Sequence, residues 1–268
     1  MKLSIVLSTH AAQFNAVAFK GAFEPNIAKI ADWGYAGVEL AVRDPALVDG
    51  DTLERVLSTH RLVVPAIGTG QAWGEEQLSF TSLDPVVRRA AIKRIKAHIP
   101  LARRFHALVI IGLIRGITPA GQSHAQSLSY LVEALQECTS EAALCGVRLA
   151  LEPINRYETD LIHSVDQGLE LLEQVGADNL GLLLDTFHMN IEEPVIEDSI
   201  RRCGEHIFHF HVADSNRWYP GAGHLDFKSI LSTLNATGYP GWVSGEYMPL
   251  PDGDTAAKNG LAALRAVG

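Results

Sequence analysis

The chain has 268 residues, 47% of them hydrophobic and 20% charged, so it is long and apolar enough to bury a sizeable core. Its formal net charge of −9, without a dense Lys/Arg cluster, argues against nucleic-acid binding. No apolar run is long enough for a membrane span, and the first residues are typical of a β-strand rather than a signal peptide. The three cysteines form no Cys-x-x-Cys pair and fit a reducing compartment. We therefore expect one globular domain over residues 1–268, located in the cytoplasm, with neither nucleic acid nor membrane as a partner.

Strand-like and helix-like segments alternate along the chain, a pattern typical of parallel βαβ units. Eight strands are predicted, at Leu3–Ser8, Gly37–Ala41, Val63–Gly68, Leu108–Leu113, Arg148–Glu152, Gly181–Asp185, Ile207–Val212 and Trp242–Glu246. The clearest helices between them are Pro85–Phe105, His124–Cys145, Ser164–Val175 and Phe227–Thr237. Eight such units without a leftover strand favour an α/β fold of the (β/α)8 TIM barrel type. The alternative is a doubly wound open sheet, but its usual Gly-rich turn after the first strand is missing at Ser8–Ala11.

Four consecutive strands, the fifth to the eighth, end in a residue type that binds metal ions. These residues are Glu152, Asp185, His211 and Glu246. In a TIM barrel the C-terminal ends of the strands form the active-site face, so we expect the four side chains to converge there. Taken singly, an acidic residue at a strand end can cap a helix and an inward His can be a core residue. The coincidence of all four on neighbouring strands favours a metal site.

The charge of these residues also indicates a cation. Burying three carboxylates together would cost on the order of several kcal/mol for each one, unless they take up protons or share a metal ion. Three carboxylates and one imidazole suit Mn²⁺ best, with Mg²⁺, Co²⁺ and Zn²⁺ as alternatives. The sequence therefore predicts one divalent metal ion as cofactor.

The strand Ile207–Val212 contains a second histidine, His209. Because a barrel strand alternates between lumen and helices, His209 and His211 are expected to face inward. The same alternation directs Phe208, Phe210 and Val212 toward the helices. His209 lies one inward step deeper than His211, so we interpret it as a core residue or a partner of a metal ligand.

These residues lie in segments that resemble the D-tagatose 3-epimerase-like sugar isomerases, and among them the 5-keto-L-gluconate epimerases most closely. The segments span essentially the whole chain: Val38–Pro45, Ala66–Ala72, Leu108–Gly116, Glu152–Asp160, Asp185–Glu193 and His209–Arg217. The resemblance implies that Glu152, Asp185, His211 and Glu246 are the metal ligands. It further implies that Glu152 and Glu246 are the catalytic acid/base pair, and that the substrate's oxygens are bound by Glu158, His188 and Arg217.

The resemblance also implies a reaction. A proton is removed from the carbon next to a ketone, an enediolate forms, and a proton returns on the opposite face. The implied conversion is 5-keto-L-gluconate to D-tagaturonate, and such an acid needs a cation at the active face. Arg115 and Arg43 are the candidates, with Arg115 preferred because it follows the fourth strand directly; its alternative role is a salt bridge to a neighbouring loop. His10, after the first strand, is a further candidate for a ligand contact.

Several other functions stay open at this point. A ketohexose 3-epimerase would act on neutral sugars such as D-tagatose or D-psicose, and an aldose-ketose or hydroxypyruvate isomerase would move a proton between adjacent carbons. An apurinic-site endonuclease shares the barrel and the ligand types but needs several metals and a basic DNA-binding face. A non-catalytic sugar-binding protein would not need two carboxylates beside a metal. The expected partner is a small keto-sugar or keto-sugar acid, and a homo-oligomer is left open.

Overall fold

The computed structural model describes residues 1–268 and contains a closed parallel barrel. Strand β1 (Lys2–Ser8) pairs with β3 (Gly37–Ala41) on one side and with β9 (Trp242–Gly245) on the other, which closes the sheet. The other barrel strands follow in chain order: β4 (Ala66–Gly68), β5 (Leu108–Ile111), β6 (Leu149–Leu151), β7 (Leu180–Asp185) and β8 (Ile207–Val212). The predicted (β/α)8 barrel is therefore confirmed.

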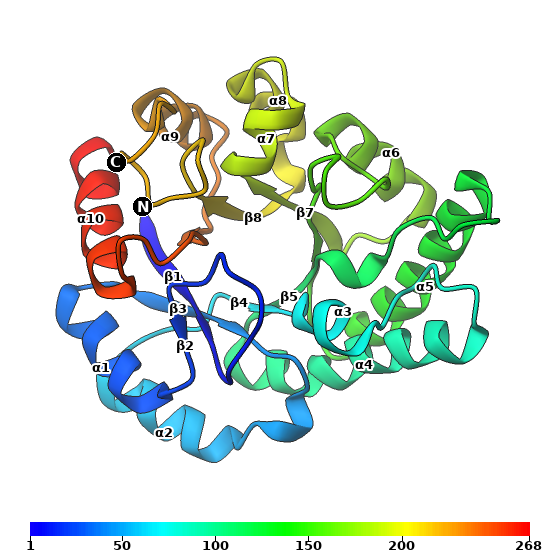
Figure 1. The fold of residues 1–268 in the computed structure, drawn as a ribbon, viewed down its shortest axis with the longest axis horizontal. Helices are drawn as coiled ribbons and strands as arrows, with labels where there is room; N and C mark the ends of the chain where they lie inside the picture. Colours follow the sequence, from blue (N-terminus) through cyan, green and yellow to red (C-terminus); the bar gives the residue numbers. More distant parts are fainter.

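The helices form a ring around the barrel, and α10 closes this ring between α9 and α1 (Figure 1). Their bounds are α1 (Phe23–Trp33), α2 (Gly50–His60), α3 (Gln71–Glu76), α4 (Pro85–Phe105), α5 (His124–Leu144), α6 (Val165–Val175), α7 (Thr186–Glu192), α8 (Ile196–Cys203), α9 (Phe227–Ala236) and α10 (Gly253–Val267). The predicted helix at Pro85–Phe105 has the observed bounds, because Asp84 caps its first turn and Pro85 suits the first helical position. No helix combines the length and the apolar character that a membrane crossing needs.

Three barrel strands end earlier than the sequence predicts, and this determines where the polar side chains lie. β6 ends at Leu151 and β9 at Gly245, so Glu152 and Glu246 are the first residues beyond their strands. β5 ends at Ile111 and is followed by a short 3-10 helix, Leu113–Arg115. A further short strand that the sequence does not predict, β2 (Phe19–Lys20), pairs only with β1.

The apolar core has two layers. The larger one lies between the strands and the helices, where Val109, Leu184 and Phe210 take part. A smaller one fills the barrel lumen, with Ile110 and Leu183 among its buried residues. Alternate residues of one strand thus belong to different layers, as the pleat of a β-strand requires. The lumen is packed below the strand ends, so the open space lies at the C-terminal mouth.

The predicted orientation of Phe208 is wrong. Phe208 packs against the lumen cluster instead of the helices, and its ring lies where a side chain at Gly181 would be. The cause is a register shift between β7 and β8: Leu182 pairs with Ile207, and Leu183 pairs with His209. The extra residue reverses the alternation locally, so Phe208 and His209 both face inward. Phe210 and Val212 face the helices as predicted.

Candidate active site

Four side chains from neighbouring strands converge at the mouth of the barrel. Glu152 follows β6, Asp185 ends β7, His211 lies in β8 and Glu246 follows β9. One ligand atom from each lies within 4.8 Å of the others. Glu152, Asp185 and His211 are buried, and only Glu246 keeps partial exposure. This is the set of residues that the sequence predicts as metal ligands.

Several atoms of this cluster are buried without any hydrogen-bond partner. They are Glu152 Oε1, Asp185 Oδ2 and His211 Nδ1. His211 Nδ1 is 3.9 Å from Asp185 Oδ2 and 3.8 Å from Glu246 Oε2, too far for a hydrogen bond. Buried polar atoms are nearly always paired, so these atoms are suited to binding a ligand. Carboxylate oxygens around one imidazole nitrogen fit a divalent cation.

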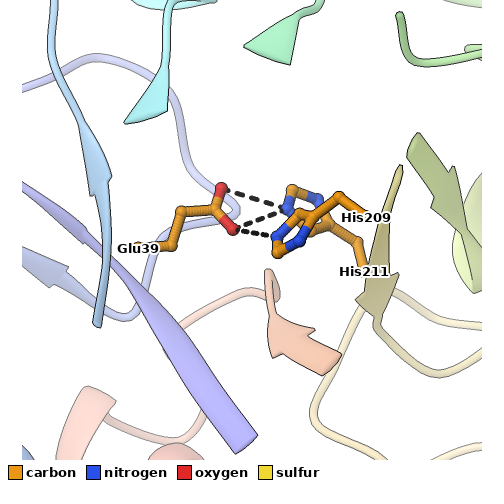
Figure 2. A group of neighbouring side chains, drawn as sticks. All are labelled: Glu39, His209 and His211. Atoms are coloured by element: carbon orange, nitrogen blue, oxygen red, sulfur yellow. Dashed lines mark hydrogen bonds and ion pairs between the residues drawn. The ribbon is translucent and has the colours of Figure 1, made fainter. Parts of the chain in front are cut away.

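Glu39 is a member of the site region that the sequence analysis misses. It lies in β3, and Figure 2 shows its carboxylate facing the rings of His209 and His211. His209 Nε2 donates a hydrogen bond to Glu39 Oε2 at 2.7 Å, and His211 Nε2 lies 2.9 Å from the same oxygen. The available signal was a charged residue at an inward position of the apolar strand Gly37–Ala41. The interpretation of His209 as a partner behind the metal ligands agrees with this arrangement.

A cavity of about 510 Å³ is lined by three of the four converging residues, Glu152, His211 and Glu246. Its lining includes three of the residues for which substrate contacts are predicted, Glu158, His188 and Arg217. Arg217 Nη1 is 2.8 Å from Glu158 Oε1, and its guanidinium lies between the rings of Phe14 and Phe187. The ion pair and the aromatic rings hold this cation in one orientation.

His188 lies between the cavity and the ligand cluster. Asn155 Nδ2 donates to His188 Nδ1 at 2.7 Å, so the ring carries its proton on Nε2. His188 Nε2 is 3.7 Å from Glu152 Oε1. Burial, with the charge of Arg217, holds the pKa of His188 well below its usual range, so the ring is neutral. It is an N–H donor at the cavity wall.

Three other candidates lie outside the cavity lining. His10 is half-buried, with its Nδ1 3.0 Å from the Thr9 hydroxyl. Arg43 forms an ion pair with Glu75 at 2.6 Å. Arg115 has no exposed surface and donates from Nη1 to the main-chain carbonyl of Glu152. The predicted substrate contacts of Arg115 and His10 therefore gain no support from this geometry, because a substrate in the cavity would not meet either side chain.

Sequence and fold comparisons agree with the barrel fold. The family model described as xylose isomerase-like TIM barrel matches residues 27–267. The chain belongs to the xylose isomerase-like TIM barrel family. It is 30% identical over 244 residues to the L-ribulose 3-epimerase of Mesorhizobium japonicum, covering 90% of this chain and 80% of the relative. It is 30% identical to the ketose 3-epimerase of Arthrobacter globiformis, covering 81% of this chain and 75% of that protein.

Two solved structures agree with these relatives. A structure of L-ribulose 3-epimerase has a TM-score of 0.82 at 28% identity, with 98% of this chain and 95% of that chain covered. The D-allulose 3-epimerase from Methylomonas sp., solved in complex with D-allulose, has a TM-score of 0.84 at 25% identity, with 100% and 97% covered. This member of the family is therefore an enzyme, an isomerase of carbohydrates.

The ionisable groups of this xylose isomerase-like site hold protons when no cation is present. Burial raises the pKa of Glu152 well above its usual range and, against the charge of His211, raises that of Glu246 to about 7. Burial alone would lower the pKa of His211, but the charges of Glu39 and Glu246 raise it to about 10. A cation that binds these ligands must displace their protons.

Cation affinity is therefore expected to rise with pH. His211 carries a proton throughout the neutral range, Glu246 carries one below about pH 7, and the raised pKa of Glu152 adds to the protons that the cation must displace. One displaced proton changes the affinity tenfold per pH unit, so the Kd for Mn²⁺ should fall roughly 100-fold or more from pH 6 to pH 8. Calorimetry in two buffers of different ionisation enthalpy would measure the released protons. An affinity that does not change with pH would contradict the proposed ligand set.

Proposed function

We propose that this chain is a divalent-metal-dependent ketose 3-epimerase, with Glu152 and Glu246 as its acid/base pair. The observation that carries the proposal is that Glu152 and Glu246 both line one cavity. They follow β6 and β9, the first and last of the four neighbouring strands that carry the proposed ligands. When bound, a divalent cation polarises the ketone and stabilises the negative charge of an enediolate. Such a reaction needs a base on one face of the carbon and an acid on the other.

The residues of the chain have distinct roles in this proposal. One of the two carboxylates removes the proton next to the ketone, and the protonated form of the other returns a proton to the opposite face. In the reverse reaction Glu152 and Glu246 exchange roles. The Nε2–H of His188 can donate to a substrate oxygen near Glu152, which is 3.7 Å away. Arg217 can bind a further oxygen, because its Nε is buried without a partner.

We infer that the preferred substrate is a neutral ketose, such as D-tagatose, D-psicose or L-ribulose. The ionisable lining of the cavity is mostly acidic: Glu39, Glu75, Glu152, Glu158 and Glu246. Arg217 is the one Arg or Lys in that lining, and Glu158 already pairs with it. A substrate carboxylate would thus meet like charge, which is costly in a confined site. The names of the two 3-epimerase relatives agree with this choice.

The conversion of 5-keto-L-gluconate to D-tagaturonate is the second candidate. The observation that favours it is the unpartnered Nε of Arg217, a buried donor that a carboxylate oxygen could accept from.

We also propose Mn²⁺ as the cation, because three carboxylates and one imidazole form an oxygen-rich ligand set. A cytoplasmic location is proposed because all three cysteines are free thiols.

The test is a substrate panel in D₂O with the Mn²⁺-loaded protein. D-Tagatose, D-psicose, L-ribulose and 5-keto-L-gluconate are incubated separately, and NMR locates deuterium and identifies the product. We expect inversion of the carbon next to the ketone, with deuterium there, and kcat/KM at least about tenfold higher for a neutral ketose than for the acid. Chelated protein is the control.

Each other outcome changes a different part of the proposal. Preference for the acid would replace the substrate. An aldose product would assign an aldose-ketose isomerase. No deuterium in any sugar, or full turnover by verified metal-free protein, would overturn the epimerase mechanism.

A further inference from the structure

The cluster of Glu39, His209 and His211 is buried in the barrel lumen. Each of the three residues is 1% exposed. Glu39 comes from β3 and the two histidines from β8, strands that are separated in the sheet by β1 and β9. The carboxylate therefore reaches across the lumen, and both rings approach it (Figure 2). In the sequence, Glu39 is 170 positions from His209 and 172 positions from His211, so the cluster links the two halves of the chain.

The hydrogen bonds of this cluster determine which ring nitrogens carry protons. An ionised carboxylate only accepts hydrogen bonds, so both Nε2 atoms that approach Glu39 must be N–H donors. For His211 this leaves Nδ1 as the atom that faces Asp185 and Glu246. That Nδ1 is buried without a partner. A ring with its proton on Nε2 has its lone pair on Nδ1, which is the form a metal ion requires.

We propose that Glu39 is a positioning residue that fixes the tautomer and orientation of His211 for metal binding. This inference rests on the metal site of the proposed function. Glu39 accepts from Nε2 of His211 and directs its Nδ1 to the centre, and His209 holds the carboxylate in place with a second hydrogen bond. Partners behind a metal-bound histidine typically change metal affinity about 10- to 100-fold when they are removed.

The variant Glu39→Gln tests this directly, because an amide has nearly the same shape but a different hydrogen-bond pattern. His211 Nε2 lies 3.0 Å from Oε1 and 2.9 Å from Oε2 of Glu39, so the NH₂ group of the amide would face this N–H in either orientation. The ring that meets the NH₂ group must move its proton to Nδ1, and on His211 this blocks the metal-binding atom. Mn²⁺ affinity, measured by competition calorimetry, should fall about 10- to 100-fold.

Ser4→Ala is the matched control, since Ser4 is a buried residue of β1 whose hydroxyl has no hydrogen-bond partner. It should bind Mn²⁺ as the unmodified protein does. A second measurement needs no variant: ¹⁵N NMR of the protein loaded with diamagnetic Zn²⁺ reports which nitrogen of each ring carries a proton. We expect Nε2–H on both His209 and His211. Because this measurement uses the unmodified protein, it tests the proposal even if Glu39→Gln fails to fold.

The outcomes separate this inference from the proposed function. Unchanged Mn²⁺ affinity in folded Glu39→Gln, or a His211 ring without a proton on Nε2, would overturn the role of Glu39 even in an active epimerase. Conversely, a large affinity loss in a protein that epimerises no sugar would support Glu39 and refute the epimerase. Equal losses in Glu39→Gln and Ser4→Ala would mean that any buried substitution in the barrel strands disturbs the site, and would also overturn the proposal.

Discussion

Glu246→Gln is expected to lower kcat for epimerisation by about 10²- to 10⁴-fold, the usual contribution of a general acid or base. The amide keeps one oxygen toward the cation but cannot accept the proton that inversion requires. Glu152 would still serve its own face of the carbon, so one epimer should exchange its hydrogen with solvent without inverting. NMR of the sugar in D₂O measures exchange and inversion separately.

The reciprocal variant sharpens this test. Glu152→Gln should permit exchange only in the opposite epimer, because Glu246 then serves the other face. Glu170→Gln removes an exposed carboxylate of α6 and is the matched control, with kcat unchanged. If Glu246→Gln keeps kcat within about tenfold of the unmodified enzyme, Glu246 is not an acid/base residue. Exchange of the same epimer by both variants would also contradict the two-face mechanism.

Arg115→Met is expected to lower kcat/KM by roughly 10- to 100-fold on every substrate, the scale of a lost charge-assisted hydrogen bond. Arg115 is fully buried and donates to the main-chain carbonyl of Glu152. Burial lowers its pKa to about 10, so it is still charged at neutral pH and offsets the charge of Glu152. Its loss should displace Glu152 and remove that compensation, whichever sugar is bound.

The measurement that checks this is the ratio of kcat/KM for D-tagatose and for 5-keto-L-gluconate. We expect an unchanged ratio, because Arg115 does not line the cavity. Arg115→Lys, which keeps the charge, should lose less activity than Arg115→Met. A loss confined to the acid would instead restore the sequence-based hypothesis that Arg115 binds a substrate carboxylate.

The convergence of the four proposed ligand residues could be predicted because their positions follow from local rules. Glu152, Asp185, His211 and Glu246 stand at or just beyond the ends of consecutive strands, and parallel strands in a barrel bring such ends together. The alternation of a regular strand then supplies the inward direction. These rules need only the approximate bounds of each strand. Errors of one or two residues in the predicted strand ends therefore left the predicted positions of the four side chains unchanged.

Other features depend on three-dimensional details that local patterns do not contain. Phe208 faces the lumen because of a register shift between two strands, and nothing in Ile207–Val212 itself indicates that shift. Arg115 follows β5 as expected, but the 3-10 turn Leu113–Arg115 directs it behind Glu152. Glu39 meets its partners across the barrel, and a single sequence does not reveal such distant pairs.

The closed sheet divides the site between the two halves of the chain. All four ligand residues come from β6–β9, whereas the wall formed by Phe14, Val17 and Trp73 comes from segments after β1 and β4. Changes in those early loops can reshape the space offered to a sugar while the proposed metal ligands stay in place. Loop exchange between relatives is therefore a route by which substrate preference can diverge while the proton-transfer chemistry is inherited unchanged.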